Sequence, residues 1–304
     1  MIEYLAYLSI MTGIYGILSL SLNLQYGFTG LANFGHVAFF CLGAYTSTLI
    51  VVLAKGPFIL GLLGGIIAAG LFGWLISIPT ANLKEDYWAI VTLAAAEIVR
   101  LFFLNEDWIF GKGPYHGGAF GIGGIPRPLQ SWFSATTYSF FYLCIVIFFL
   151  ALTYFVIRLL TNSPFGRVLK AMREGDDLPL AMGKDVRKFR MRAMALGGGM
   201  GGLAGSLVAH FWSFIDPYQF MPIETFVVWA MVVVGGKGNN MGALVGAVII
   251  QFFYISTRFL KDFIPIDAQV LASLRMVLIG VLIVLVMLFM KEGLLKEKKR
   301  VYQG

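Results

Sequence analysis

Long apolar runs without charged side chains alternate with short polar segments along this chain. Residues 4–54 contain no Asp, Glu, Lys or Arg. This run is too long for one membrane-spanning helix of about 20 residues and long enough for two. Glycines, Thr29 and Asn33 cluster between residues 27 and 35. The cluster predicts a break there, and a re-entrant element is compatible with such a break.

The same pattern repeats almost to the C-terminus. Residues 87–104 are apolar except for Glu97 and Arg100. The further charge-free runs cover residues 56–83, 128–157, 193–215, 225–236, 238–257 and 276–290. The pattern predicts an all-α fold, a polytopic transmembrane helical bundle of roughly eight to ten spans. We expect one transmembrane domain over residues 1–304.

The composition supports a membrane environment. The chain is 59% hydrophobic and 13% charged, whereas soluble domains carry about 25% charged residues. The net charge is +7, and the basic residues responsible for it lie in short loops between apolar runs. Membrane proteins typically carry such an excess of Lys and Arg in their cytoplasmic loops. We therefore expect membrane lipid, and no nucleic acid, as a partner.

Two basic segments predict the orientation in a prokaryotic plasma membrane. Residues 158–192 contain nine basic and four acidic residues, and the tail 291–304 contains five basic and two acidic ones. Together they hold fourteen of the 23 basic residues, so both are expected in the cytoplasm. Loops 105–137 and 258–272 then face outward, and the side of the N-terminus stays open.

The longest cytoplasmic segment, about residues 159–192, is predicted to contain two short helices. Pro164 after Ser163 is typical of a helix start, and apolar residues recur at helical spacing through Met172. Glu174, Asp176 and Asp177 are candidates to cap a second helix that stops at Gly183. Leu178, Leu180 and Met182 then form an apolar ridge. A solvated loop is the alternative interpretation, but the ridge favours burial against a docked protein.

Six segments, in order, resemble the permeases of branched-chain amino-acid ABC transporters, the LivH/LivM family, and LivM in particular. The first, residues 21–46, reads SLNLQYGFTGLANFGHVAFFCLGAYT, and residues 86–101 read DYWAIVTLAAAEIVRL. Residues 117–126 read GGAFGIGGIP, and residues 171–186 read AMREGDDLPLAMGKDV. The last two are GGLAGSLVAHFWSFIDPYQF and VVVGGKGNNMGALVGA, which lie at residues 201–220 and 232–247.

The resemblance implies a permease subunit that works with a second homologous permease, two ABC ATPase subunits and an extracytoplasmic solute-binding protein. Whether the second permease is LivH-like or another copy of this chain stays open. The implied ATPase-coupling residues are Arg173, Glu174, Asp176, Asp177, Leu178, Leu180, Met182 and Gly183. The chain has no GxxxxGK[ST] phosphate loop, so ATP is expected to act on the partner subunits. We expect no catalytic residue, cofactor or metal in this chain.

Four polar residues in apolar surroundings are candidates to line a translocation pathway: Asn23, Asn33, His36 and Glu97. Structural roles compete with this interpretation, because Glu97 is spaced to pair with Arg100, and a backbone hydrogen bond from His36 would hold the break. An ABC permease for urea or short amides and a stand-alone secondary transporter stay open as alternatives. A membrane enzyme would need a convergent set of nucleophilic or metal-binding groups.

Overall fold

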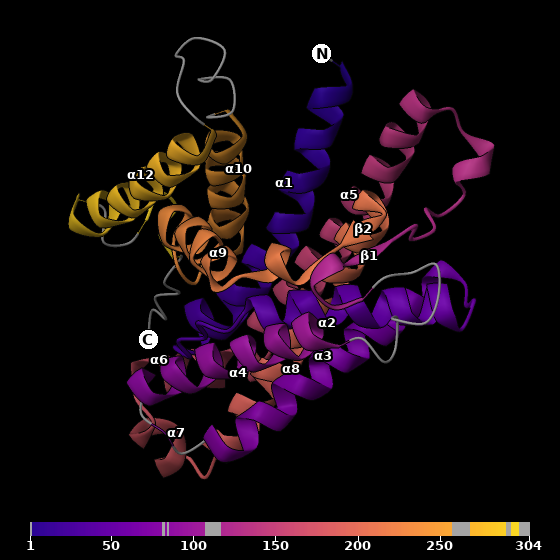
Figure 1. Ribbon diagram of the computed structural model, residues 1–304. Helices are drawn as coiled ribbons and strands as arrows, with labels where there is room; N and C mark the ends of the chain where they lie inside the picture. Colours follow the sequence, from indigo (N-terminus) through magenta and orange to yellow (C-terminus); the bar gives the residue numbers. More distant parts are fainter. Residues whose placement is uncertain are drawn as a thin grey trace.

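The computed structural model describes residues 2–80, 83, 85–106, 117–256, 268–289 and 293–297, and most of them are helical. The α-helices (Figure 1) are α1 (Ile2–Leu22), α2 (Val37–Thr48), α3 (Phe58–Thr80), α4 (Glu85–Asn105), α5 (Ala135–Asn162), α6 (Pro164–Glu174), α7 (Asp177–Ala181), α8 (Val186–Trp212), α9 (Pro222–Gly235), α10 (Asn240–Ser256) and α12 (Ala268–Phe289). The π-helical segments η1 (Asn23–Phe28) and η2 (Leu49–Leu53) continue α1 and α2. The remaining elements are three 3₁₀ turns, η3 (Gly118–Phe120), η4 (Gln130–Trp132) and η5 (Pro217–Phe220), and two strands, β1 (Ile122–Gly123) and β2 (Phe214–Ile215).

The predicted all-α membrane bundle is confirmed. By length and composition, 4 helical segments of the described chain can cross a membrane: Glu3–Phe28, Phe58–Thr80, Asp86–Asn105 and Thr137–Asn162. Shorter apolar helices cover Val37–Leu53, Pro222–Gly235 and Asn240–Tyr254. The count of eight to ten spans stays a prediction. Residues 107–116 and 258–267 of the expected outer loops, and 291–292 and 298–304 of the tail, lie outside the described residues.

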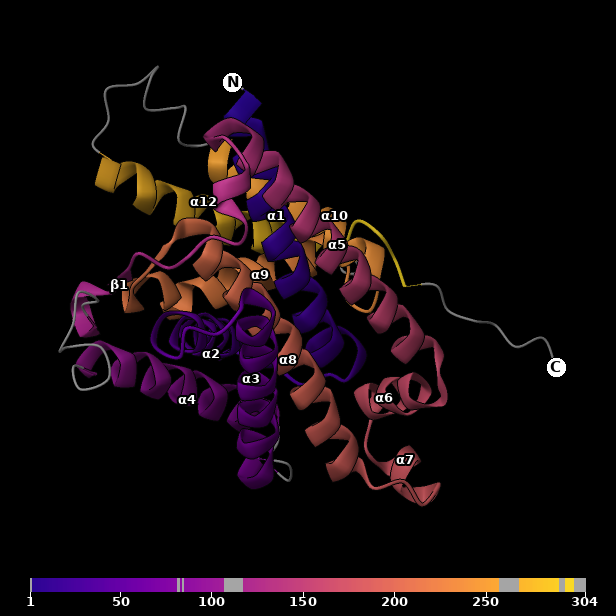
Figure 2. The same cartoon turned by 90° about the vertical axis from the view of Figure 1, so that its right-hand side faces the viewer.

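Helix α1 forms the centre of the bundle. It packs against α5, α8, α9 and α10, and Figure 2 shows α5 and α10 beside it. Ile10, Ile14 and Ile17 are fully buried along it, which is the burial expected of a helix that is apolar all round. The break predicted between residues 27 and 35 lies after α1: the helix continues through η1 into an irregular segment, and α2 begins at Val37.

Helices α2, α3 and α8 form a second, tightly packed group. A Cβ atom added to Gly202 would collide with the backbone carbonyl of Gly65 in α3, and one added to Gly43 in α2 would collide with the backbone of Gly202. Glycine at these positions lets the three backbones touch, as small residues do between membrane helices. The small-residue spacing in residues 197–205 therefore serves close helix contact.

A small sheet connects the segment before α5 to the end of α8. Strands β1 and β2 are antiparallel, with Ile122 opposite Ile215, and both side chains are fully buried. The Asp216 carboxylate then caps η5 by accepting hydrogen bonds from the backbone N–H groups of Tyr218 and Gln219, at 2.7 and 3.1 Å. The sheet and the cap fix the chain between α8 and α9.

Candidate functional site

Helix α6 lies along the bundle through an apolar face. Leu169 is fully buried and Met172 is 5% exposed, and both belong to a cluster with Leu24 of η1. Pro164 occupies the first turn, as predicted. The Ser163 hydroxyl does not cap α6, because it donates to the carbonyl oxygen of Leu160 in the preceding helix at 2.7 Å. The start of α6 is therefore set by the proline and by burial of its apolar face, without a side-chain cap.

Helix α7 follows α6 and carries the predicted apolar ridge. Leu178, Leu180 and Met182 are 59%, 55% and 65% exposed. Gly183 has a φ of +70° and ends the helix in the left-handed conformation that glycine adopts without strain. Figures 1 and 2 place α7 at the far end of the molecule from the start of α1. The ridge therefore faces out of the described chain.

The predicted capping of α7 by acidic side chains is wrong. Asp176 occupies the N-cap position but makes no side-chain cap hydrogen bond. Its carboxylate instead pairs with the Arg190 guanidinium of α8 at 2.7 Å, while Asp177 lies within the helix itself. The ion pair fixes α7 to α8 over a sequence separation of 14 residues, which an intrahelical cap would not do.

Asp185 caps α8 instead. Its side chain accepts a hydrogen bond from the backbone N–H of Lys188 at 3.1 Å and pairs with the Lys188 ammonium group at 3.0 Å. The hydrogen bonds from Lys188 lower the pKa of the Asp185 carboxyl below its ordinary value. The carboxylate also lies at the positive end of the α8 dipole, so both local geometry and charge favour the start of α8 here.

The break after α1 is held by a buried amide and imidazole network. The Gln25 side-chain oxygen accepts a hydrogen bond from the Asn33 amide at 2.8 Å and lies 3.1 Å from Nδ1 of His36. The Gln25 amide donates to the carbonyl oxygen of Met194 in α8 at 3.3 Å. All three side chains of the network are at most 1% exposed. The partner of His36 here is thus a side chain, where a neighbouring backbone group was predicted.

Asn23 belongs to a different contact at the start of η1. Its side-chain oxygen accepts a hydrogen bond from the backbone N–H of Gly238 at 2.9 Å, and its amide donates to Asn240 at 3.3 Å. Gly238 lies in the turn between α9 and α10, and Asn240 is the first residue of α10. Asn23 therefore connects η1 to the turn and to the start of α10, while Gln25, which also pairs with Asn33 and His36, connects the break to α8.

Glu97 and Arg100 form the predicted ion pair on α4. The Arg100 Nε donates to the Glu97 carboxylate at 2.9 Å. The Glu97 side chain is 36% exposed and that of Arg100 is 12% exposed. The hydrogen bonds between Arg100 and Glu97 stay within α4 and do not extend to the network around Gln25, so the structure does not bring the four candidate pathway residues together.

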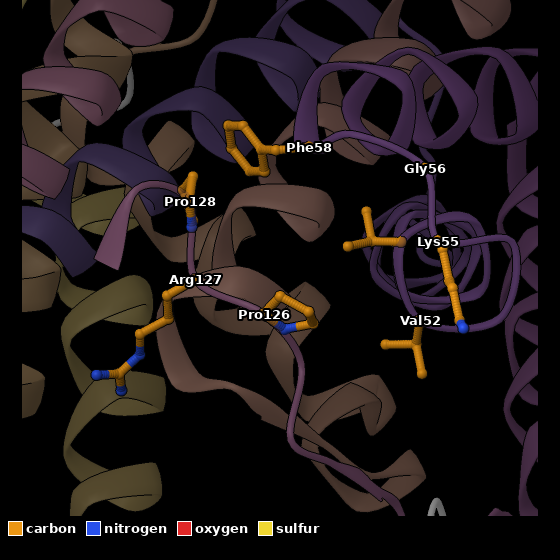
Figure 3. Close-up of a pocket in the computed structure, with 8 residues that line it drawn as sticks. Val52, Lys55, Gly56, Phe58, Pro126, Arg127 and Pro128 are labelled. Atoms are coloured by element: carbon orange, nitrogen blue, oxygen red, sulfur yellow. The ribbon is translucent and has the colours of Figure 1, made fainter. Parts of the chain in front are cut away.

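A surface pocket of about 420 Å³ lies where the segment after η2 meets the segment before η4 (Figure 3). Val52, Phe58 and Pro126 supply apolar walls. Figure 3 shows the guanidinium of Arg127 directed away from Lys55, and its Nε donates to the Ser213 hydroxyl at 2.9 Å. The two cations therefore do not converge on one point, which a site for a small anion would require.

Sequence reasoning missed two buried polar groups that the fold pairs. Gln25 is the central acceptor of the network described above, and Tyr15 donates to the Glu224 carboxylate at 2.6 Å between α1 and α9. Both partners of the second pair are more than 200 positions apart in the chain. The one local signal for Gln25 was its position between the glycines of the first quoted segment.

Comparison with known proteins places these elements in a family. The family model described as "Branched-chain amino acid transport system / permease component" matches residues 4–287. The probable branched-chain amino acid transport permease protein LivM of Methanocaldococcus jannaschii is 30% identical over 98% of this chain and 94% of its own length. The high-affinity LivM permease protein of Escherichia coli is 32% identical over 94% of this chain and 68% of its own length.

More distant relatives include the LivH permease protein of Salmonella typhimurium, which is 23% identical over 86% of this chain and 89% of its own length. No solved structure matches the chain. The family match runs from residue 4 in α1 to residue 287 in α12, so it includes η1, α6, α7 and the turn that holds Asn23. This chain therefore belongs to the family of branched-chain amino acid transport permeases and is LivM-like within it.

Proposed function

We propose that this chain is the transmembrane permease subunit of an ABC importer that moves branched-chain or related small neutral amino acids into the cell. Separate ATPase subunits supply the energy, and the substrate crosses by alternating access between this chain and a second permease. An extracytoplasmic binding protein delivers the substrate. The family match over residues 4–287 and the names of the relatives support this proposal.

In this mechanism, the ATPase subunits bind the exposed apolar ridge on α7. An apolar surface of this kind on a short helix is a suitable anchor for a groove on a partner protein. The Asp176–Arg190 ion pair at 2.7 Å connects α7 to α8, and α8 runs for 27 residues through the bundle. A force applied to α7 by the ATPase subunits would therefore act on α8 directly. Differential contact with two states of the ATPases then shifts the permease between its own states.

The charge pattern sets the sidedness of this proposal. Helices α6 and α7 lie in the segment with nine basic residues among 158–192, so we place them in the cytoplasm together with the C-terminal tail. The ATPase subunits are then on the same side as α7. The β1–β2 sheet and the pocket of Figure 3 are placed outside, where a binding protein approaches.

Of the four candidate pathway residues, Glu97 is the one that fits a surface shared with a second permease. Its side chain is 36% exposed, whereas Asn23, Asn33 and His36 are at most 1% exposed within this subunit. A charged pair on a membrane-facing surface is costly against lipid. We therefore assign the α4 face that carries Glu97 to the interface through which the substrate passes.

Reconstitution tests the function. Proteoliposomes would contain this chain, its companion permease and the ATPase subunits, with ATP inside and binding protein plus radiolabelled leucine outside. We expect uptake that requires both ATP and the binding protein. Accumulation of urea or a short amide in place of leucine would assign a different ABC substrate. Leucine uptake by this chain alone along a proton or sodium gradient would overturn the proposal.

A pair of variants tests the role of α7. Leu180→Asp places a charge in the proposed contact, so the ATPase subunits should no longer copurify with the permease. Leu129→Asp is the matched control, because Leu129 is 51% exposed and is separated from α6 by the 28-residue helix α5. Equal copurification in both variants would show that the ridge is not the docking surface.

A further inference from the structure

The described part of the C-terminal tail, residues 293–297, is hydrogen-bonded to the end of α9. The backbone N–H groups of Leu294 and Leu295 donate to the carbonyl oxygens of Val234 and Gly235, both at 2.9 Å. The last carbonyl groups of a helix have no partner within it. The tail therefore supplies hydrogen-bond donors for two of the carbonyl groups at the C-terminal end of α9.

The turn between α9 and α10 also binds the tail. The Asn239 amide donates to the carbonyl oxygens of Leu295 and Lys296 at 3.3 and 3.0 Å. A Cβ atom added to Gly293 would collide with the backbone of Gly236, so the two strands of chain are in direct backbone contact. These contacts hold residues 293–297 against the turn independently of any charge.

Glu297 then joins the tail to α6. Its two carboxylate oxygens lie 2.7 Å from the Lys170 ammonium group and 2.7 Å from the Arg173 guanidinium group. The Glu297 side chain is 17% exposed, and that of Arg173 is 22% exposed. Burial disfavours the charged carboxylate, but the hydrogen bonds from Lys170 and Arg173 hold the pKa of Glu297 below its ordinary value. The acid is thus charged when it bridges the two cations.

Arg173 extends the connection to the break after α1. Its second terminal nitrogen donates to the carbonyl oxygen of Gly27 in η1 at 2.6 Å. A Cβ atom on Gly238 would lie 2.7 Å from the Arg173 guanidinium group and 2.9 Å from the Glu297 carboxylate. Four segments therefore meet at one junction: η1, α6, the turn at 236–240 and the tail.

From this junction we infer that Glu297 is a positioning residue for coupling, and that the tail is a clasp between α6 and the end of α9. The inference rests on the proposed function, because it assumes that α6 and α7 receive force from the ATPase subunits. Helix α6 packs against α5, α7, α8 and η1. The clasp adds α9 to this set, so that movement of α6 is passed to the α9–α10 pair as well as to α8.

Transport assays test the coupling in the reconstituted complex described above. Glu297→Ala should lower ATP-driven uptake of radiolabelled leucine per ATP hydrolysed by roughly fivefold or more, the range of typical coupling between sites, while ATP hydrolysis continues. Lys237→Ala is the matched control, because the Lys237 side chain is exposed in the same turn and makes none of the contacts described above. Its ratio of uptake to hydrolysis should equal that of the wild type.

A charge exchange separates coupling from simple loss of fold. In Glu297→Lys the tail is repelled by both Lys170 and Arg173. In the double variant Glu297→Lys with Lys170→Glu the attraction to position 170 is restored, while Arg173 still repels the tail. We expect coupling to fall in the single variant and to recover in part in the double variant. Unchanged coupling in Glu297→Ala, or no recovery in the double variant, would overturn the inference.

Crosslinking tests the clasp without any transport. With Cys41 and Cys144 replaced by alanine, cysteines at positions 170 and 297 should be joined by a short bifunctional thiol reagent in membranes. The same reagent should not join cysteines at positions 170 and 129, because the 28-residue helix α5 separates Leu129 from α6. Absence of the 170–297 crosslink overturns the clasp itself, whereas a crosslink without ATP-driven uptake in the wild-type complex places the failure in the proposed function.

Discussion

Replacement of Gln25 by alanine tests how the break after α1 is stabilised. The variant removes the acceptor for Asn33, the partner of His36 and the donor to the Met194 carbonyl oxygen. All of these groups lie in buried surroundings. In soluble proteins each buried group left without a partner costs about 1–3 kcal/mol.

Hydrogen bonds between membrane helices are weaker, at about 0.6 kcal/mol on average and at most about 1.7 kcal/mol, because the unfolded chain in the membrane also finds partners. Three lost interactions of Gln25 therefore predict a destabilisation of about 2–5 kcal/mol. For a chain of this size that corresponds to a fall in Tm of about 4–10 °C.

Thermal denaturation of the detergent-purified protein, followed by loss of the monodisperse size-exclusion peak, measures this fall. Gln130→Ala is the matched control, because Gln130 is exposed in η4 and the same atoms are removed there. We expect its Tm to stay within about 1 °C of the wild type, as for most surface substitutions. A Gln25→Ala protein as stable as this control would refute the argument that the network holds the break.

Three further predictions concern packing, charge and pH. Gly202→Val should abolish the folded, monodisperse protein, because its side chain would collide with the carbonyl group of Gly65; a normal elution profile would contradict the backbone contact. Arg190→Ala should leave the Asp176 carboxylate without its 2.7 Å partner and increase protease cleavage between α7 and α8, and an unchanged digestion rate would argue against that tether. The lowered pKa of Glu297 means that the ionic link between the tail and α6 is stable above the ordinary pKa of 4.5 and is lost as the pH falls through the still lower folded value. The distance between spin labels at positions 174 and 296 should therefore stay constant from pH 8 to pH 5 and change only below about pH 4.5, and a change already at pH 6 would be inconsistent with this.

Local signals made α6 and α7 predictable. Pro164 and Gly183 mark a helix start and a helix stop through their own backbone restrictions, and these restrictions act whatever the rest of the fold does. The apolar spacing through Met172 also predicted the face that is buried. The Glu97–Arg100 pair was predictable for the same reason, since residues three apart in a helix face each other.

Contacts between distant segments were not predictable. Asp176 was expected to cap its own helix, but its carboxylate pairs with Arg190 of α8 and makes no cap hydrogen bond. Glu297 gave no sequence signal, because its partners on α6 are more than 120 positions away. The π-helical form of η1 also depends on its surroundings, since Gln25 and Asn23 reach partners in α8 and in the turn after α9.

The bare backbone contact of Gly43, Gly65 and Gly202 limits which parts of the molecule can shift. Side chains at a helix interface can change rotamer and absorb a displacement, but three glycines have no rotamers to change. Sliding or rotating any of these helices would push a peptide group into a peptide group, which interiors at near-crystalline density do not accommodate. Helices α2, α3 and α8 therefore move as one rigid body. Any rearrangement during a transport cycle has to occur at the interfaces between this group and the other helices.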